Sequence, residues 1–366
     1  MKFVVSKGEL SNLIRKIQNI VPQNAPIPVL SHFLIEAQGD EVVFTATDLT
    51  VGTRCAVKAK VYEKGALSIP SKRFFSLVRE LTESNIEVNA VDGEMAEIKA
   101  GSSRFRLHGM DKDEYPALPD LRAAMKFTID STLLKEMFYR TSFAVSKEDT
   151  RYVLTGVLIR IEDGKMIFVG TDGKRLAKVQ ADISLDESVE GEYIIPLKAV
   201  EEIIKLLEDE GEATVYITDD KVAVESGNTM LVTKLLAGEY PDFEQVIASQ
   251  SEVKMLLHRE ELIILLRQIA LFTNNTSQSV RFTFTSGELM LTANCTDIGE
   301  GKVSMPVNYS GKKIEIAFNP LFFLDILKHS RDETVTLGIS DAFNPGVITD
   351  STNSLFIIMP MRLNDE

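Results

Sequence analysis

Two hydrophobic patterns alternate along the chain: short stretches in which every second residue is apolar, and longer stretches with apolar residues three and four positions apart. The first pattern is typical of strands with one buried face, and the second of helices with one buried face. The N-terminal segment MKFVVSKGELSNLIRKI therefore predicts a strand that runs into a helix. The same order of elements is predicted from residue 125, MKFTIDSTLLKEMFYRT, and from residue 252, EVKMLLHREELIILLRQI.

A pair of strands that ends in Thr-Asp follows each of these predicted helices. The pairs lie in VLSHFLIEAQGDEVVFTATD, VLTGVLIRIEDGKMIFVGTD and SVRFTFTSGELMLTANCTD, and they end at Asp48, Asp172 and Asp297. Gly-Asp, Asp-Gly and Ser-Gly in the middle of these segments favour hairpin turns. Because an Asp beside a turn readily accepts hydrogen bonds from turn N–H groups, we predict a structural role for the three carboxylates.

A strand leading into a second helix comes next in each copy: GALSIPSKRFFSLVREL, GEYIIPLKAVEEIIKLL and IEIAFNPLFFLDILKH. Pro70, Pro196 and Pro320 lie at the helix start, where proline removes no helical hydrogen bond. Two strands close each copy, and the first two copies then share a tail around Tyr115 and Tyr240. These features recur in one order at a spacing of about 125 residues, so the chain is interpreted as one unit present three times.

Three domains follow from this repeat, with boundaries predicted at 1–120, 125–247 and 250–366. Each domain would pack two helices on antiparallel sheets, which is an α+β fold with the helices gathered on one side. The apolar stretches are shorter than a membrane span, and the N-terminus lacks the pattern of a signal peptide. Cys55 and Cys295 offer neither a disulfide framework nor a metal-binding spacing. We therefore expect a cytoplasmic protein.

The formal net charge of −14 argues against nucleic-acid binding unless the positive charge is concentrated on one surface. The predicted helices meet that condition, because basic residues recur at positions expected to be exposed, whereas the acidic surplus lies mostly in strands and loops. A single lysine of this kind is usually part of an ordinary solvated helix face. The residues are Lys7, Arg15, Lys16, Lys72, Arg73, Lys135, Arg140, Lys198, Lys205, Arg259, Arg267, Lys328 and Arg331.

Catalytic and cofactor sites are not indicated by the sequence. His32, His108, His258 and His329 fall at unrelated places in the repeat, so no shared catalytic constellation is predicted. The segment GTDGKR lacks the Gly-x4-Gly-Lys-Ser/Thr spacing with which backbone N–H groups cradle phosphates. We expect no enzyme activity, no metal and no cofactor.

Several features of the sequence belong together: the repeated unit, the segment IPVLSHFLIEAQGDEVVFTATDL, the run TRYVLTGVL followed by VGTDGKRLA, the GEYPDF tail and the terminal MPMRL. In these features the chain resembles the bacterial replicative sliding clamp, the beta subunit of DNA polymerase III. The resemblance covers the whole chain. It implies a head-to-tail homodimer, closed into a ring with helices lining the hole. It also implies a protein without chemistry of its own that encircles double-stranded DNA and tethers polymerases to it.

The resemblance further implies three sets of functional residues. DNA contacts would fall at Asn24, Lys72, Glu148, Tyr152 and Val153. A dimer interface would pair Phe105 and Leu107 of one copy with Leu271 and Phe272 of the other, with Asp297 and Glu300 near the arginines that flank Phe105. A hydrophobic groove for short peptides from the polymerase III catalytic subunit, the clamp loader, other polymerases and repair proteins would be formed by Leu154, Thr171, Gly173, Arg175, Leu176, Pro241, Val246, Ile358, Met359, Pro360, Met361 and Leu363.

Physical chemistry favours the same reading. A ring that slides cannot read base edges, so its inner surface needs diffuse Lys/Arg attraction to phosphates, and an acidic exterior directs the duplex to that surface. A Met-rich apolar groove suits one short hydrophobic segment from several partners in turn. The alternative is a monomeric three-repeat scaffold that binds only proteins, which would have the same periodicity but no need for basic helices.

Overall fold

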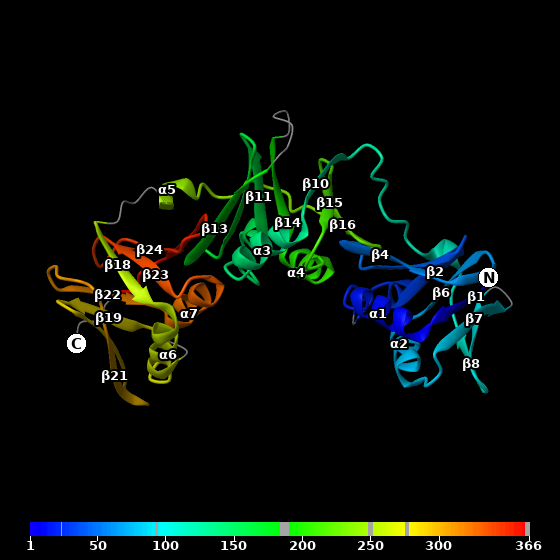
Figure 1. Cartoon of the computed structure of the whole chain (residues 1–366), viewed down its shortest axis with the longest axis horizontal. Helices are drawn as coiled ribbons and strands as arrows, with labels where there is room; N and C mark the ends of the chain where they lie inside the picture. The colour runs from blue at the N-terminus through cyan, green and yellow to red at the C-terminus, as the bar shows by residue number, and fades with distance from the viewer. Residues whose placement is uncertain (23, 92–93, 184–189, 248–251, 275–277, 363–366) are drawn as a thin grey trace. The chain divides into compact units, whose positions relative to one another are not determined.

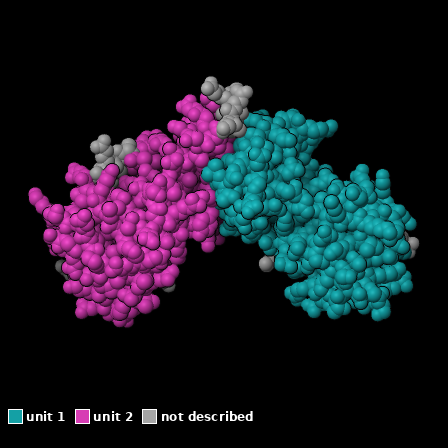
Figure 2. Space-filling view, in the orientation of Figure 1, with its two compact units in different colours: residues 1–135, 198–235 teal, residues 136–197, 236–366 magenta. Residues whose placement is uncertain are grey.

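The computed structural model describes residues 1–22, 24–91, 94–183, 190–247, 252–274 and 278–362. The chain forms two compact units. The first contains Met1–Lys135 and Lys198–Leu235, and the second contains Glu136–Leu197 and Leu236–Glu366 (Figure 2). Each unit contains two antiparallel sheets among its described residues.

Unit 1 contains a five-stranded sheet in the order β5-β1-β7-β8-β9 and an eight-stranded sheet in the order β10-β15-β16-β17-β4-β3-β2-β6. The larger sheet joins two repeats, because β17 of the second repeat pairs with β4 of the first, with Leu231 opposite Thr53. The strands are β1 Lys2–Ser6, β2 His32–Gln38, β3 Glu41–Thr47, β4 Val51–Lys58, β5 Lys60–Glu63, β6 Gly65–Pro70, β7 Asn85–Val91, β8 Met95–Ala100, β9 Ser103–His108, β10 Met125–Asp130, β15 Glu212–Ile217, β16 Lys221–Ser226 and β17 Thr229–Lys234.

Unit 2 contains an eight-stranded sheet in the order β14-β11-β12-β13-β25-β24-β23-β18 and a four-stranded sheet in the order β21-β20-β19-β22. Here β13 of the second repeat pairs with β25 of the third, with Ala177 opposite Phe356. The strands are β11 Gly156–Glu162, β12 Lys165–Thr171, β13 Arg175–Asp182, β14 Gly191–Pro196, β18 Val253–His258, β19 Val280–Thr285, β20 Glu288–Cys295, β21 Gly299–Pro306, β22 Ile314–Phe318, β23 Thr334–Ile339, β24 Gly346–Thr349 and β25 Ser354–Ile358.

Two long helices belong to each repeat, as predicted, and each begins directly after a strand or one residue later (Figure 1). In the first repeat α1 and α2 pack against each other, and in the third α6 and α7 do so. The helices are α1 Lys7–Ile17, α2 Ser71–Glu80, α3 Ser131–Ser142, α4 Leu197–Leu206, α6 Arg259–Ala270 and α7 Pro320–His329, with the short α5 Glu244–Ile247 and the 3-10 turns η1 Pro28–Ser31, η2 Lys112–Glu114 and η3 Tyr152–Thr155.

Phenylalanines are among the largest side chains that are fully buried in the described residues. In the first repeat the ring of Phe44 lies between Phe33 and Phe74, and in the third repeat Phe282 stacks on Phe323 with ring centroids 5.2 Å apart. These rings are fully buried, and burying each one is worth roughly 1.5–3 kcal/mol. The predicted fold class, three repeated domains with helices on antiparallel sheets, is confirmed.

The strand pairing repeats with the sequence. The first strand of each repeat pairs with the strand that follows its second helix, giving β1–β7, β10–β15 and β18–β23. The meanders β2–β3–β4, β11–β12–β13 and β19–β20–β21 are each flanked by the strand before the second helix. The last strands of the first two meanders, β4 and β13, each pair with a strand of a neighbouring repeat. The last strand of the third meander, β21, is an edge strand, and so is β9, the last strand of the first repeat.

The Thr-Asp turns are confirmed in two copies and differ in the third. Asp48 Oδ1 accepts hydrogen bonds from the N–H groups of Thr50 and Val51, at 2.9 and 2.7 Å. Asp172 Oδ1 accepts the equivalent two hydrogen bonds, from the N–H groups of Lys174 and Arg175. In the third copy Cys295 pairs directly with Gly299, so the strands run further and the turn is tighter. Counted from the first paired residue of β3, β12 and β20, the residue equivalent to Asp48 and Asp172 is Cys295. The prediction that Asp297 is the third equivalent aspartate is therefore wrong.

Candidate functional site

The turn between β12 and β13 is the most tightly bonded part of the predicted peptide site. Thr171 Oγ1 donates to the carbonyl of Arg175 at 2.6 Å and accepts from the N–H of Gly173 at 3.0 Å. Gly173 has a φ of 80°, a left-handed conformation that favours glycine. Together with the bonds to Asp172, these contacts fix the turn, so the side chains that leave it are held in place before any ligand binds.

Arg175 is held by three acceptors rather than presented to solvent. Its Nη1 donates to Asp325 at 2.8 Å, its Nη2 to the carbonyl of Phe143 at 2.8 Å, and its Nε to Asp172 at 3.2 Å. The guanidinium also lies 4.6 Å from the ring centroid of Phe322. Only 11% of the side chain is exposed, so Arg175 organises the predicted site more than it offers a free charge to a ligand.

An apolar cluster lies beneath this turn. Leu176 belongs to a buried group with Phe243 and Ile357, and Val246 packs against the same group while remaining half-buried. Leu154 is buried at the end of η3. Pro241 is exposed at the start of the segment that leads to α5. Leu176 and Val246 therefore lie in one cluster, although the sequence separates them widely.

The C-terminal segment reaches the same turn through the β13–β25 pairing. Arg175 lies opposite Ile358, and the N–H of Met359 donates to the carbonyl of Lys174 at 2.9 Å. The chain then crosses to β22, where the N–H of Met361 donates to the carbonyl of Ala317 at 2.8 Å. Met359 is 38% exposed and Pro360 is partly exposed, which leaves apolar surface beside the turn. Leu363 lies outside the described residues and stays a prediction.

Phe343 is an exposed aromatic residue that sequence reasoning missed. The residue is 88% exposed, although Asp341 fixes the loop by accepting from the N–H groups of Phe343 and Asn344 at 2.7 and 2.9 Å. The loop leads into β24, where Gly346 pairs with Ile358 next to the exposed methionine. A phenylalanine inside the turn-forming segment DAFNPG was the available signal, since turns rarely need an aromatic side chain.

Three of the predicted DNA contacts lie on one loop of unit 2. Tyr152 is 63% exposed and Glu148 is exposed, whereas Val153 is half-buried against the apolar cluster of Leu176. Arg151, between them, pairs with Asp149 at 3.1 Å. The loop thus presents Tyr152 to solvent, while Val153 faces the protein.

In unit 1 the predicted contacts Asn24 and Lys72 are both exposed. Among the predicted basic helix positions, Arg15, Lys72, Arg73 and Arg267 are exposed, and the described residues provide them with no acidic partner within 4 Å. The positions with such a partner are Lys16, Lys135, Arg140, Lys198, Lys205, Arg259, Lys328 and Arg331. The expectation of exposure is wrong for Arg140, which is 2% exposed because Asp350 and neighbouring groups enclose it.

The predicted dimer residues lie on or beside edge strands. Phe105 on β9 is 38% exposed, and Leu271, just after α6, is 73% exposed. Phe272 is half-buried beside β21, so close that a Cβ added to Gly301 would lie 2.8 Å from its ring. Surface of this kind on separate edges of one chain is typical of an interface with a second copy.

Two arginines of β9 bind a single carboxylate on the neighbouring strand β8. Glu97 on β8 pairs with Arg104 and with Lys99, the latter at 3.0 Å, and the hydrogen bond from Arg104 is the main cause that lowers the pKa of Glu97 to about 2. Arg106 lies 3.4 Å from the same carboxylate. Two arginines therefore share one acid, which leaves positive charge on the edge strand for a further acidic partner.

Within the described ranges, no group of three or more His, Cys, Asp or Glu side chains could hold a metal ion. The described helices also include none that is long and apolar enough to cross a membrane.

Comparison with known proteins gives a consistent result over the whole chain. Models of the DNA polymerase III beta subunit match its N-terminal domain at residues 1–119, its central domain at 128–242 and its C-terminal domain at 244–362. The chain is 66% identical to the beta sliding clamp of Chlamydia pneumoniae over 366 residues, which is 100% of both chains.

Solved structures give the same result for the fold. The DNA polymerase III beta subunit of Pseudomonas aeruginosa matches with a TM-score of 0.95 and 27% identity, over 99% of this chain and 100% of that one. A second structure of the sliding clamp from this organism, with the same TM-score, identity and coverage, is bound to griselimycin. These relatives do not support the monomeric scaffold alternative. With three beta-subunit domains in sequence and a curated relative of equal length, the chain belongs to the DNA polymerase III beta subunit family, the bacterial sliding clamps.

Proposed function

We propose that two copies of the chain close head to tail into a ring around duplex DNA and hold DNA polymerase III on its template. Sliding clamps are processivity factors and not catalysts, and membership of the family gives the chain that function. The ring itself is supported by the edge strands β9 and β21. Their counterparts in the other repeats pair with each other inside the chain, so a second copy would supply each edge with the partner that it lacks.

The repeat also predicts the register of the intersubunit pair. Leu231 lies opposite Thr53 at the first junction, and Phe356 lies opposite Ala177 at the second. Strand β9 is the equivalent of β17 and β25, and β21 is the equivalent of β4 and β13. In these equivalent strands Phe105 takes the position of Leu231 and Phe356, and Gly301 that of Thr53 and Ala177, so Phe105 would lie opposite Gly301. A large apolar residue would then face a small one at all three junctions.

This register has two favourable consequences. The ring of Phe105 would cover Gly301 and contact Phe272, which already lies against that glycine. Arg106 would lie opposite Glu300, and opposite charges that face each other across an antiparallel pair stabilise it. The positive charge left over beside Glu97 would thus meet an acid from the second copy.

A disulfide tests both the interface and the register. Arg106→Cys with Glu300→Cys should form an intersubunit disulfide on mild oxidation, giving a covalent dimer on a non-reducing gel. Arg106→Cys with Lys302→Cys is the matched control, since its thiols would be two residues out of register and should cross-link poorly. The native Cys55 and Cys295 are buried and should react slowly. A dimer that cross-links equally in both variants would contradict the register, and monomers throughout would contradict the ring.

Encirclement has its own test. The clamp loader and ATP would place the Arg106→Cys/Glu300→Cys protein on nicked circular DNA, and oxidation would then close both joints covalently. A topological link should survive high salt, which removes ordinary phosphate contacts, and should be lost when the DNA is linearised. Release from intact circles by salt alone would show surface binding instead.

The DNA contacts in the proposal are Asn24, Lys72, Glu148, Tyr152 and Val153, with exposed basic helix residues supplying attraction that does not depend on sequence. Of these five, Lys72 is favoured as an exposed cation and Tyr152 as an aromatic side chain that is 63% exposed, whereas Val153 is disfavoured because it packs inward.

The proposed partner site is the apolar surface around the β12–β13 turn and Met359. It would bind short hydrophobic segments of the polymerase catalytic subunit, the clamp loader and repair proteins in the bacterial cytoplasm. Griselimycin, bound to a relative of this chain, provides a competitor: it should displace a labelled peptide from the polymerase catalytic subunit. Failure of both to bind would contradict the assignment of this site.

A further inference from the structure

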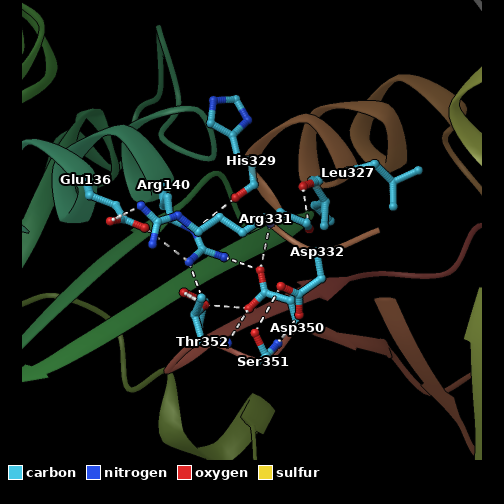
Figure 3. Close-up of polar contacts among 12 residues, drawn as sticks. Glu136, Arg140, Leu327, His329, Arg331, Asp332, Asp350, Ser351 and Thr352 are labelled. Carbon is cyan, nitrogen blue, oxygen red and sulfur yellow. Dashed lines mark hydrogen bonds and ion pairs between the residues drawn. The ribbon is translucent and has the colours of Figure 1, made fainter. Parts of the chain in front are cut away.

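A buried ion pair joins the second repeat to the third inside unit 2. Arg140 on α3 places its Nη2 2.5 Å from the Asp350 carboxylate in the turn between β24 and β25 (Figure 3). The side chains are 3% and 0% exposed. Thr352 Oγ1 accepts from Nη1 at 2.5 Å, and the carbonyl of His329 accepts from Nε at 2.9 Å. The guanidinium is therefore bonded on several sides by groups of the third repeat.

Further contacts surround this pair. Glu136 lies 3.6 Å from Arg140 and 3.0 Å from Arg331, whose N–H also donates to Asp350 at 3.0 Å. The guanidinium lies 5.6 Å from the ring centroid of Phe356 on β25. Burial alone would raise the pKa of Asp350, but the bonds from Thr352, from the Arg331 backbone and the charge of Arg140 lower it, so the carboxylate stays ionised.

The ion pair is connected to the predicted peptide site by direct contacts. His329, whose carbonyl accepts from Arg140, stacks on Phe143 with ring centroids 4.2 Å apart. The carbonyl of Phe143 accepts from Arg175. Asp325 binds the His329 ring through its carbonyl at 2.7 Å and Arg175 through its carboxylate. A continuous set of contacts thus runs from Asp350 to the β12–β13 turn.

The equivalent position at the other junction within the chain is different. Lys16 takes the place of Arg140 on α1, and its ammonium lies 3.8 Å from Glu208 with side-chain exposures of 32% and 55%. Removing two charges from water is costly, so a buried pair adds little to stability, and fixing one geometry is a role for which such pairs are retained in some proteins. The buried pair, Arg140 with Asp350, lies at the junction of the second and third repeats, both of which contribute predicted peptide residues.

We propose that Arg140 is a positioning residue, whose buried pair with Asp350 sets the third repeat against the second in one register and so aligns the two halves of the peptide site. This inference rests on the proposed partner site. Leu176 and Val246 belong to the second repeat, whereas Met359 and the residues after it belong to the third. A shift between the repeats would separate these halves without unfolding either.

The decisive variant replaces both charges by apolar groups, Arg140→Met with Asp350→Leu, because such replacements often keep or raise stability while the directional bonds are lost. We expect it to unfold at or above the wild-type temperature and to remain a dimer. It should bind a fluorescein-labelled peptide from the polymerase catalytic subunit about tenfold more weakly by anisotropy, a coupling of ordinary size. Lys16→Met with Glu208→Gln is the matched control and should bind normally.

A distance measurement reads the register directly. Nitroxide labels at Lys165→Cys in the second repeat and Lys313→Cys in the third, both exposed, should give a narrow distance distribution in otherwise wild-type protein and a broader one with the apolar pair. Wild-type affinity with an equally narrow distribution in the apolar variant would overturn the proposal. If the wild-type protein binds no peptide, the partner site fails, and the distance distribution still decides whether the ion pair sets the register.

Discussion

Lys198 at the start of α4 forms an ion pair with Asp48, the same carboxylate that accepts the N–H groups of the β3–β4 turn in the first repeat. Burial would raise the pKa of Asp48, but the Lys198 hydrogen bond and the turn N–H groups outweigh burial and lower it. Lys198 therefore supports a turn as well as carrying surface charge. Reversing its charge would bring two carboxylates together and alter that turn.

Lys72 and Arg73 on α2 give a cleaner test of DNA binding, because they are exposed and have no acidic partner among the described residues. Lys72→Glu with Arg73→Glu should weaken retention on nicked circular DNA at low salt. Loss of a phosphate contact should lower the salt slope by about one per contact. Stability should change by less than about 0.5 kcal/mol. Lys198→Glu, in contrast, should lower the unfolding temperature. Unchanged retention and salt slope in the double variant would exclude α2 from the DNA surface.

Phe272 and Gly301 provide a test of the dimer. Phe272→Asp should give folded monomers, because a carboxylate would face the Phe105 ring of the second copy without compensation. Light scattering gives the mass, and circular dichroism checks the fold. Tyr62→Asp is a suitable control, since Tyr62 is 54% exposed on β5, at the opposite edge of the sheet from β9. A dimer that persists in Phe272→Asp would rule out this interface.

Met359 and Met361 provide a test of the peptide site. Because the N–H of Met361 bonds to β22, substitution disturbs the chain less than removing residues 359–366. Met359→Ser with Met361→Ser should cost about 1.5–3 kcal/mol of binding free energy for each side chain that the peptide buries, at least roughly tenfold in affinity. Dimerisation should be unchanged. Deleting residues 359–366 should abolish peptide binding. Equal peptide affinity in the serine variant and the wild type would exclude the methionines.

His329 predicts a pH dependence of stability. Its ring lies between Tyr139 of α3 and Phe143, which follows that helix, and burial lowers its pKa in the folded state. The unfolded chain then takes up the proton first, so the stability that this group contributes is complete above about pH 6.5 and lost as pH falls through the folded pKa. His329→Phe keeps a stacking ring and cannot titrate, so its unfolding temperature should fall less on acidification.

The comparison for His329 is made between the two proteins at each pH. His32, whose pKa burial also lowers, is present in both and cancels in the difference. An identical pH dependence in wild type and His329→Phe would mean that the ring does not titrate differently in the folded state.

The repeat, the order of strands and helices, and the fold class were predictable because each depends on local hydrophobic period and turn chemistry. The burial of Arg140 was not, because its position on a helix is typical of an exposed residue and its partner Asp350 is remote in sequence. The extended hairpin at Cys295 could not be predicted for another reason. The third repeat contains the same Thr-Asp dipeptide as the other two, but strand register depends on the residues that pair across the hairpin.

The predicted peptide residues show a similar division. The apolar members could be proposed from the sequence, and the structure brings Leu176 and Val246 into one cluster and places Met359 beside the β12–β13 turn. The restraint on Arg175 could not be foreseen, since it depends on Asp325 and Phe143 from other elements. Phe343 was missed although an aromatic residue inside a turn-forming segment is an unusual feature.

In the proposed ring, the unlike edges β9 and β21 would determine what happens when intact and defective subunits are mixed. A subunit altered at β21 would keep a normal β9, so it would still join one intact copy through that edge and leave the other joint open. Each defective chain would therefore remove an intact one from the pool of closed rings. Random pairing at equal amounts would leave about a quarter of the pairs able to close at both joints. A substitution confined to this edge is thus expected to be dominant negative in a cell, whereas one that unfolds the subunit is expected to be recessive.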